Sequence, residues 1–242
     1  SSMPSIRIWT PESDYDRNAV CCLAKKIVQY YGVNIEISYG TKQGFNDAAR
    51  KPDGVKKAVD TYLKHNDLVI FLIDADSARS QAQRRKERNS LLNRIQEVVN
   101  ASGGKAILIL MLQELEAWLL VDCLGICCYY TKNPETRNRE EWIKFAKRQQ
   151  PGKTNLIEEA ELGGKNAKEY LEELSRDILI KINPNLKNKP QNLKERQYTE
   201  DKSSEIAECL EMSNQTIKRN ESLEEFAQCL KQLATHDEIN QG

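Results

Sequence analysis

A continuous apolar run, Leu68 to Ile73, constrains the fold of this chain more than any other feature of its sequence. A run without polar alternation is typical of a strand that is buried on both faces, as in a parallel sheet with helices on either side. Ala106 to Leu110 is a second run of this kind. We therefore predict that both runs are doubly buried strands of one sheet, and that helices cover its two faces.

The segments around these runs predict alternating strands and helices as far as about Cys128. Further strands are predicted at Ile6–Trp9 and Val33–Tyr39. Helices are predicted at Tyr15–Tyr31, Val55–Leu63, Ser77–Val99 and Leu112–Leu120, and a loop at Gly40–Asp53. This order predicts an α/β fold with a mostly parallel, four-stranded sheet and right-handed crossovers between its strands.

After Cys128 the strand signals fade, apart from a weak run at Ile178 to Ile180. Helical stretches remain, and loops that contain proline separate them. A chain of 242 residues has room for a sheet domain and a smaller helical part. We predict a sheet domain at residues 3–128 and a helical C-terminal region at residues 129–235 that packs on it.

Composition limits the classes of function. Hydrophobic residues make up 39% of the chain and charged residues 30%, and the formal net charge is zero. Such a chain is soluble and globular, and it has no overall basic field to attract a polyanion, so nucleic acid would need a local patch or a metal ion. The longest apolar run, Ala106 to Leu112, is too short to cross a bilayer, and no signal-peptide pattern is present. We expect a cytoplasmic protein that does not enter a membrane.

The cysteines do not indicate a zinc site. There are seven of them, none in a CxxC pair, and the two histidines, His65 and His236, are not close to any cysteine in the sequence. Free thiols buried in a reducing compartment are the better interpretation.

Acidic residues follow three of the four predicted strands. Glu12 comes after the first strand, Asp74 and Asp76 after the third, and Glu114 and Glu116 after the fourth. The carboxyl ends of parallel strands meet at one edge of a sheet, so we expect these carboxylates to converge there. Clustered carboxylates repel one another and need a cation, and their hard oxygen atoms suit Mg²⁺ or Mn²⁺.

Simpler interpretations stay open for most of these acids. Asp76 could cap the helix predicted to begin at Ser77, and Asp14 could cap the first helix. Glu114 and Glu116 could be solvated acids that complement a helix dipole.

The same residues resemble a known family. A Glu after the first strand and an Asp-x-Asp after the third look like the TOPRIM fold. The segment Glu114–Asp122, ELEAWLLVD, resembles the ELEAWLLAD signature of a bacterial TOPRIM-like family of unknown function, whose members often sit beside ATPases in anti-phage defence loci. The resemblance implies that residues 3–128 are a catalytic domain. It also implies a Mg²⁺- or Mn²⁺-dependent nuclease that acts on DNA or RNA with a partner ATPase of a defence operon.

The resemblance also implies roles for individual residues. Glu12, Asp74 and Asp76 would be the catalytic, metal-binding acids, with Glu12 as a possible general base, and Glu116 would be a further metal ligand. Asp16 and Glu114 would support the site. Ser13 departs from the pattern, because TOPRIM proteins usually have glycine there and glycine allows a tighter turn.

Two basic residues are candidates for phosphate contacts. Arg79 follows Asp76 by one helical turn, and Lys202 lies in the segment Leu193 to Lys202, which is similar to one near the carboxyl end of the family. Trp118, within the ELEAWLLVD segment, is expected to be a packing residue.

Two other functions remain as alternatives. A TOPRIM-like subunit without activity could act by binding the partner ATPase, which Ser13 and the neutral charge balance favour. A phosphoacceptor receiver domain also gathers acids at strand ends, but here the acidic pair follows the third strand rather than the first. Whether the substrate is DNA or RNA, and whether the chain forms a homo-oligomer, stays open.

Overall fold

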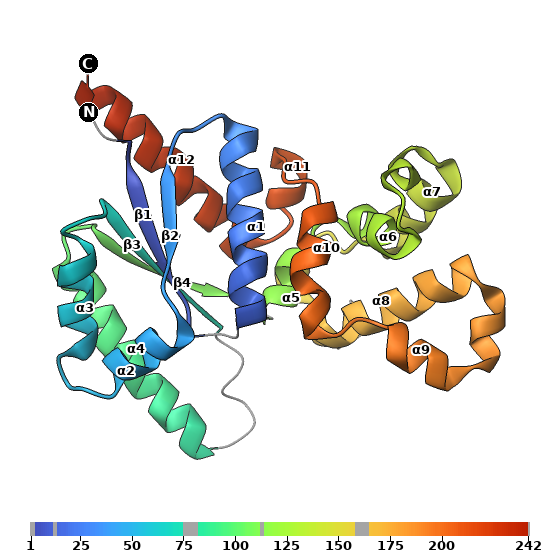
Figure 1. The fold of residues 1–242 in the computed structure, drawn as a ribbon, viewed down its shortest axis with the longest axis horizontal. Helices are drawn as coiled ribbons and strands as arrows, with labels where there is room; N and C mark the ends of the chain where they lie inside the picture. Colours follow the sequence, from blue (N-terminus) through green and yellow to red (C-terminus); the bar gives the residue numbers. More distant parts are fainter. Residues whose placement is uncertain (1–2, 12–13, 75–81, 112–113, 158–164, 242) are drawn as a thin grey trace.

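The computed structural model of the chain describes residues 3–11, 14–74, 82–111, 114–157 and 165–241. Its centre is a sheet of four parallel strands in the order β2-β1-β3-β4 (Figure 1). The strands are β1 (Ser5–Trp9), β2 (Glu36–Tyr39), β3 (Leu68–Asp74) and β4 (Ala106–Met111). The predicted α/β fold with a parallel four-stranded sheet is therefore confirmed.

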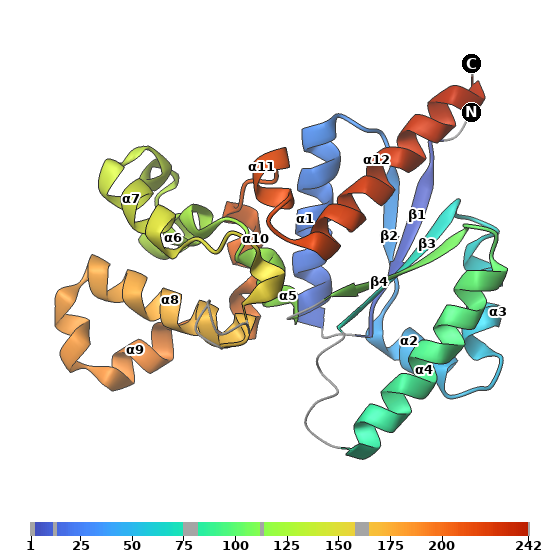
Figure 2. The same ribbon diagram turned by 180° about the vertical axis from the view of Figure 1, so that it is seen from behind.

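Helices cover both faces of this sheet (Figures 1 and 2). On one face lie α1 (Asp14–Tyr31) and the last helix, α12 (Glu221–Gln241). On the other face lie α2 (Lys42–Ala49), α3 (Gly54–Tyr62) and α4 (Ala82–Ala101). Two hydrophobic cores result, one on each side of the strands.

The apolar run Leu68 to Ile73 divides its side chains between these two cores. All seven residues of β3 are buried. Leu68, Ile70 and Leu72 belong to the core under α1, whereas Val69, Phe71 and Ile73 belong to the core under α3 and α4. Because side chains alternate along a strand, the next residue, Asp74, continues the series that faces α1. The prediction of a doubly buried strand is confirmed here.

The strand predicted at Ala106 to Leu110 is confirmed as β4, but the prediction that it is buried on both faces was wrong. β4 is the edge strand of the sheet, and Leu110 is 40% exposed. An apolar run shows that a segment can be buried, but an edge position follows from strand order, which the run does not encode.

The predicted loop at Gly40–Asp53 contains a helix, α2. Thr41 caps it by accepting a hydrogen bond of 3.0 Å from the amide of Gly44. Phe45 anchors the helix, because its ring packs edge-on against Trp9 with centroids 5.0 Å apart. A short polar helix with a single buried apolar residue has little hydrophobic periodicity, so the sequence pattern did not predict this helix.

The C-terminal region is helical in the described ranges. Its helices include α6 (Cys123–Thr131), α7 (Glu140–Gln149), α8 (Ala167–Ile182), α9 (Pro190–Arg196), α10 (Ser203–Cys209) and α11 (Asn214–Ile217). The weak strand signal at Ile178 to Ile180 was wrong, since these residues lie in α8. Helices α6 to α9 form a lobe that stands away from the sheet, whereas α10 and α12 return to pack on α1 (Figure 1).

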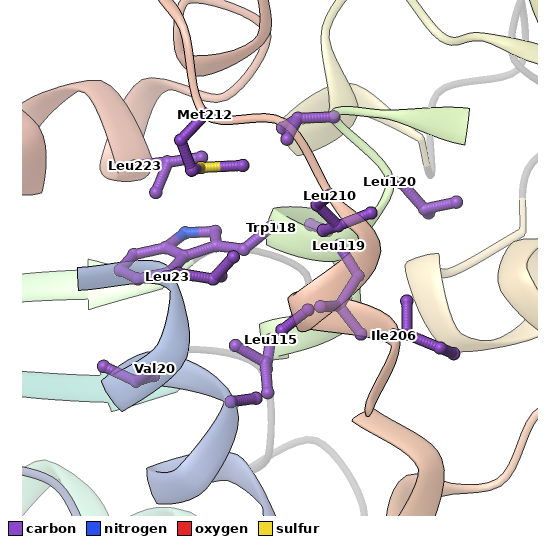
Figure 3. Close-up of a cluster of buried hydrophobic side chains, with 14 of the residues drawn as sticks. Val20, Leu23, Leu115, Trp118, Leu119, Leu120, Ile206, Leu210, Met212 and Leu223 are labelled. Carbon is purple, nitrogen blue, oxygen red and sulfur yellow. The ribbon is translucent and has the colours of Figure 1, made fainter. Parts of the chain in front are cut away.

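A short helix, α5 (Glu114–Leu119), joins the sheet to this lobe. Figure 3 shows its apolar side chains, Trp118 among them, between Leu23 of α1 and the segment after α10. The Trp118 indole N–H donates a hydrogen bond of 2.8 Å to Ser222, and its ring stacks on Phe226. The packing role predicted for Trp118 is therefore confirmed, and this packing fixes the position of α5 and of the acids in its first turn.

None of the helices in the described ranges combines the length and the apolar character that a membrane span requires. All seven cysteines are free thiols. Only Cys123, Cys127 and Cys128 are buried, so the prediction of burial holds for three of the seven.

Candidate functional site

The strand order places a switch point between the two central strands. β1 and β3 are neighbours, while β2 lies beyond β1 and β4 lies beyond β3. The crossovers from the central strands therefore lead away from each other, and ligands of open α/β sheets bind beyond the carboxyl ends of the strands at such a point. Asp74 is the last residue of β3 and lies at this position.

Asp74 and Glu114 come together at this edge. Asp74 is 7% exposed, and it pairs in register with Met111, the last residue of β4. Glu114 begins α5 three residues later. Burial raises the pKa of Glu114 to about 8, and the negative charges of Glu116 and Asp74 add to this effect. Burial and the neighbouring negative charges therefore both favour the protonated form of Glu114.

The backbone at Glu114 is unusual. Its φ is +69°, in the left-handed region that residues with a side chain rarely adopt. The other non-glycine residue with positive φ in the described ranges is Lys132, which ends α6 as a left-handed C-cap, a common role for this conformation. Glu114 instead begins a helix, and strained backbone of this kind concentrates at functional sites.

Glu116 is the most deeply placed acid of the cluster. It is 5% exposed and accepts a hydrogen bond of 3.0 Å from the hydroxyl of Tyr198. Burial raises the pKa of Glu116, while the Tyr198 hydrogen bond and the positive charge of Lys168 oppose that rise. The alternative interpretation of Glu116 as a solvated acid at a helix start is therefore wrong.

Tyr198 connects two further acids to the site. Burial and the charge of Glu116 raise the pKa of Tyr198 well above its usual value, and the charges of Asp16 and Glu200 contribute. Asp16, on the first turn of α1, was predicted to support the site, and its electrostatic contact with Tyr198 places it at the edge of this cluster. Glu200 lies in a short 3₁₀ helix, η5 (Glu200–Lys202).

The lobe fixes the position of Tyr198. The backbone N–H of Tyr198 donates a hydrogen bond of 2.8 Å to the hydroxyl of Ser175, on α8. The Ser175 hydroxyl in turn donates to the carbonyl of Glu172 at 2.6 Å. Tyr198 itself is 1% exposed. The acidic cluster thus includes a residue from the helical lobe, and sequence reasoning missed its role although Tyr198 was part of the resembling C-terminal segment.

The remaining predicted residues divide into two groups. Glu12, Asp76 and Arg79 lie outside the described residues, so their predicted roles stay predictions. Lys202 lies on η5, where its ammonium group donates a hydrogen bond of 2.8 Å to the Thr199 hydroxyl. Lys202 lines a cavity whose lining includes none of the clustered acids.

The donor set fits a divalent cation only in part. Buried carboxylate oxygens are the ligands that Mg²⁺ and Mn²⁺ prefer, and Asp74 offers them. Within the described part of the chain, however, no three Asp, Glu, His or Cys side chains are arranged to hold a metal ion. Glu12 and Asp76, which were predicted to bind the metal together with Asp74, lie outside the described residues.

Comparison with known proteins gives no relative for this chain. No protein-family model matches it, and no curated protein or solved structure does so either.

Proposed function

We propose that this chain is a Mg²⁺- or Mn²⁺-dependent nuclease that hydrolyses phosphodiester bonds of DNA or RNA, with a TOPRIM-like sheet domain. The buried acids at the switch point carry this proposal. Glu114 lies in electrostatic contact with both Asp74 and Glu116, and burial together with these charges raises its pKa to about 8. Grouped, buried carboxylates reduce stability unless a cation offsets their charge, so such an arrangement is expected where cations bind.

Each acid of the site would have its own role in the reaction. Asp74, with Glu12 and Asp76, would hold the cation, which would polarise the phosphate and lower the pKa of a bound water. Glu116, fixed by Tyr198, keeps a carboxylate at the wall of the site. Glu114 can exchange a proton near neutral pH, so it can accept the proton of the attacking water or supply one to the departing oxygen.

The resemblance of the ELEAWLLVD segment supports the TOPRIM-like assignment, and so does the position of Asp74 at the end of the third strand. Action as an effector beside an ATPase of a defence operon rests on that resemblance alone. The second candidate is a non-catalytic subunit that binds such an ATPase. The lack of three metal-binding side chains within the described ranges favours it, as does Ser13 in place of glycine.

Cleavage assays test the proposal. Labelled single- and double-stranded DNA and RNA would be incubated with the protein in Mg²⁺, in Mn²⁺ and in a chelator. We expect metal-dependent cleavage that falls by about 100-fold or more in Asp74→Asn and in Glu12→Gln. Glu36→Gln is the control, because Glu36 is exposed on β2.

Two results would overturn the proposal. One is cleavage that persists unchanged in both Asp74→Asn and Glu12→Gln. The other is no cleavage of any substrate together with no Mn²⁺ binding by titration calorimetry. Stable co-purification of an ATPase with an inactive protein would favour the second candidate.

A further inference from the structure

A large cavity lies between the helical lobe and α10, and none of the clustered acids lines it. Its volume is about 890 Å³, within the range of sites that hold small molecules. Its walls come from α6 and the segment 132–137 after it, and from α8, α9, η5 and α10. The lining includes Tyr129, Tyr130, Lys132, Arg137, Arg196 and Lys202.

Three cations of the cavity lie outside the ion pairs of the described residues. Lys132, Arg196 and Lys202 form no ion pair with any residue that the structure describes. Arg137, by contrast, is occupied by Asp122 at 2.5 Å. Three basic side chains from different elements, none of them held in an ion pair among the described residues, fit an anionic group such as a phosphate.

Two of the three carboxylates that line the cavity accept hydrogen bonds from other side chains. Glu205 accepts a hydrogen bond of 3.2 Å from the Tyr129 hydroxyl, and Glu195 accepts one of 3.4 Å from Gln191. Glu208 is exposed. These groups reduce the positive potential of the cavity, so a ligand must gain part of its affinity from contacts other than charge.

Aromatic and apolar side chains offer such contacts. The rings of Tyr129 and Tyr130 meet edge-to-face, with centroids 4.9 Å apart, and both line the cavity beside Leu179. A flat heterocycle gains stacking energy against tyrosine whatever its hydrogen-bonding pattern. Basic groups next to aromatic rings therefore match a molecule that joins a phosphate to a base.

One segment of chain connects this cavity to the acidic cluster. Arg196 and Lys202 line the cavity, and Tyr198, between them in sequence, donates its hydroxyl hydrogen bond to Glu116. The cavity and the proposed cleavage site therefore share a wall segment. A nucleic-acid strand bound at the acidic cluster could place a neighbouring nucleotide against Arg196 and Lys202.

We propose that the cavity binds a nucleotide, with the phosphate at Lys132, Arg196 and Lys202 and the base against Tyr129 and Tyr130. The nucleotide is either free or part of a substrate strand. The second source rests on the proposed nuclease function, whereas binding of a free nucleotide does not.

Binding measurements on the full chain test this proposal. Titration calorimetry would use adenosine and uridine monophosphates, inorganic phosphate, and a short single-stranded oligonucleotide. We expect the charge reversal Lys132→Glu with Arg196→Glu to weaken nucleotide binding by about tenfold or more. The control is Lys187→Glu with Lys189→Glu, which changes charge equally at exposed sites of the same lobe that do not line the cavity. Thermal unfolding of each variant checks that it is folded.

Two further variants separate the parts of the proposal. Tyr129→Leu should weaken binding of the nucleotides but not of inorganic phosphate. Asp74→Asn should leave mononucleotide binding unchanged, since Asp74 does not line the cavity. Tight mononucleotide binding identifies a free nucleotide as the ligand, and binding of the oligonucleotide alone identifies a strand.

The proposal fails if the wild-type protein binds neither nucleotide nor oligonucleotide, or if the cavity variant and its control bind equally well. It also fails if inorganic phosphate binds as tightly as the nucleotides. Cleavage without cavity binding would overturn this inference and leave the nuclease proposal intact. Nucleotide binding by a protein that neither cleaves any substrate nor binds Mn²⁺ would support this inference and overturn the nuclease proposal.

Discussion

The hydroxyl of Tyr198 donates a hydrogen bond of 3.0 Å to Glu116 although 82 residues separate them in the chain. Both side chains are buried. Glu116 belongs to the helix that leaves the sheet, and Tyr198 follows α9 of the lobe. This bond therefore brings the lobe into direct contact with the acidic edge of the sheet, and the acidic site is built from both parts of the molecule.

Replacing Tyr198 with phenylalanine tests this contact. Tyr198→Phe removes the donor and leaves the buried Glu116 carboxyl without it, so the free energy of unfolding should fall by about 1–3 kcal/mol at pH 7. Urea unfolding followed by circular dichroism measures the change. The control is Tyr30→Phe, which should change the free energy of unfolding little because Tyr30 is 46% exposed. Equal stability of the two variants would show that the bond contributes nothing net.

The raised pKa of Glu114 predicts how stability depends on pH. Between its ordinary value of 4.5 and about 8, the folded protein holds a proton that the unfolded chain has released. Stability therefore falls as pH rises through this window, and it is highest at the acidic end. Glu114→Gln cannot ionise, so it should lessen the fall and be more stable than wild type near pH 8. Unfolding midpoints measured from pH 5 to 8 test this; identical profiles for the two proteins would contradict it.

A divalent cation should act on the same window. If Mg²⁺ or Mn²⁺ binds at Asp74, it favours the ionised form of its neighbour Glu114 and lowers that pKa. Adding the cation should then raise the melting temperature more at pH 8 than at pH 5. The control is Asp74→Asn, for which the added cation should have little effect. If the melting temperature rises equally at both pH values, or as much in Asp74→Asn as in the wild type, the cation does not bind at this site.

Much of this site could be predicted from the sequence because the sheet is parallel. The run Leu68 to Ile73 predicted a buried strand, and the end of that strand places Asp74 at the carboxyl edge of the sheet. Glu114 and Glu116 followed from the next strand in the same way. Strand alternation further indicates that Asp74 faces α1, as Leu68 and Leu72 do.

The contribution of the lobe could not be predicted in the same way. Tyr198 and Lys168 reach the cluster through the packing of α8 and of the segment after α9, and no periodicity in the sequence encodes that packing. The edge position of β4 was missed for a related reason. The order of strands in a sheet depends on how the helices pack on its two faces, and that packing involves the whole chain.

The lobe contains an ion pair between the buried Asp122 and the partly exposed Arg137 that should matter for its stability. Asp122 caps α6 and is bound by Arg137 at 2.5 Å and by the amide of Glu211 at 2.8 Å. Asp122→Ala removes the main partner of Arg137 and the cap of α6, so the free energy of unfolding should fall by about 2–3 kcal/mol.

Glu140→Ala is the matched control for Asp122→Ala. Glu140 pairs with Lys144 at 3.1 Å, but both side chains are largely exposed. Its loss should cost at most about 1 kcal/mol. Chemical denaturation of the two variants compares them, and a similar small loss in both would show that the Asp122 pair is not a structural support of the lobe.

The junction between α2 and α3 depends on the absence of a side chain at Gly54. A Cβ atom there would lie 1.8 Å from the carbonyl oxygen of Ala48, which is backbone and cannot turn away. Gly54→Ala should therefore push the two helices apart and lower the free energy of unfolding by about 1–3 kcal/mol or more. Gly152→Ala is the control, since nothing lies within 4 Å of a Cβ at that position. Because α2 and α3 cover the face of the sheet opposite α1, we expect Gly54→Ala to lower the melting temperature while leaving the acidic cluster's cation binding intact. Loss of cation binding in a folded Gly54→Ala protein would mean that the two faces of the sheet are coupled more tightly than their separate cores indicate.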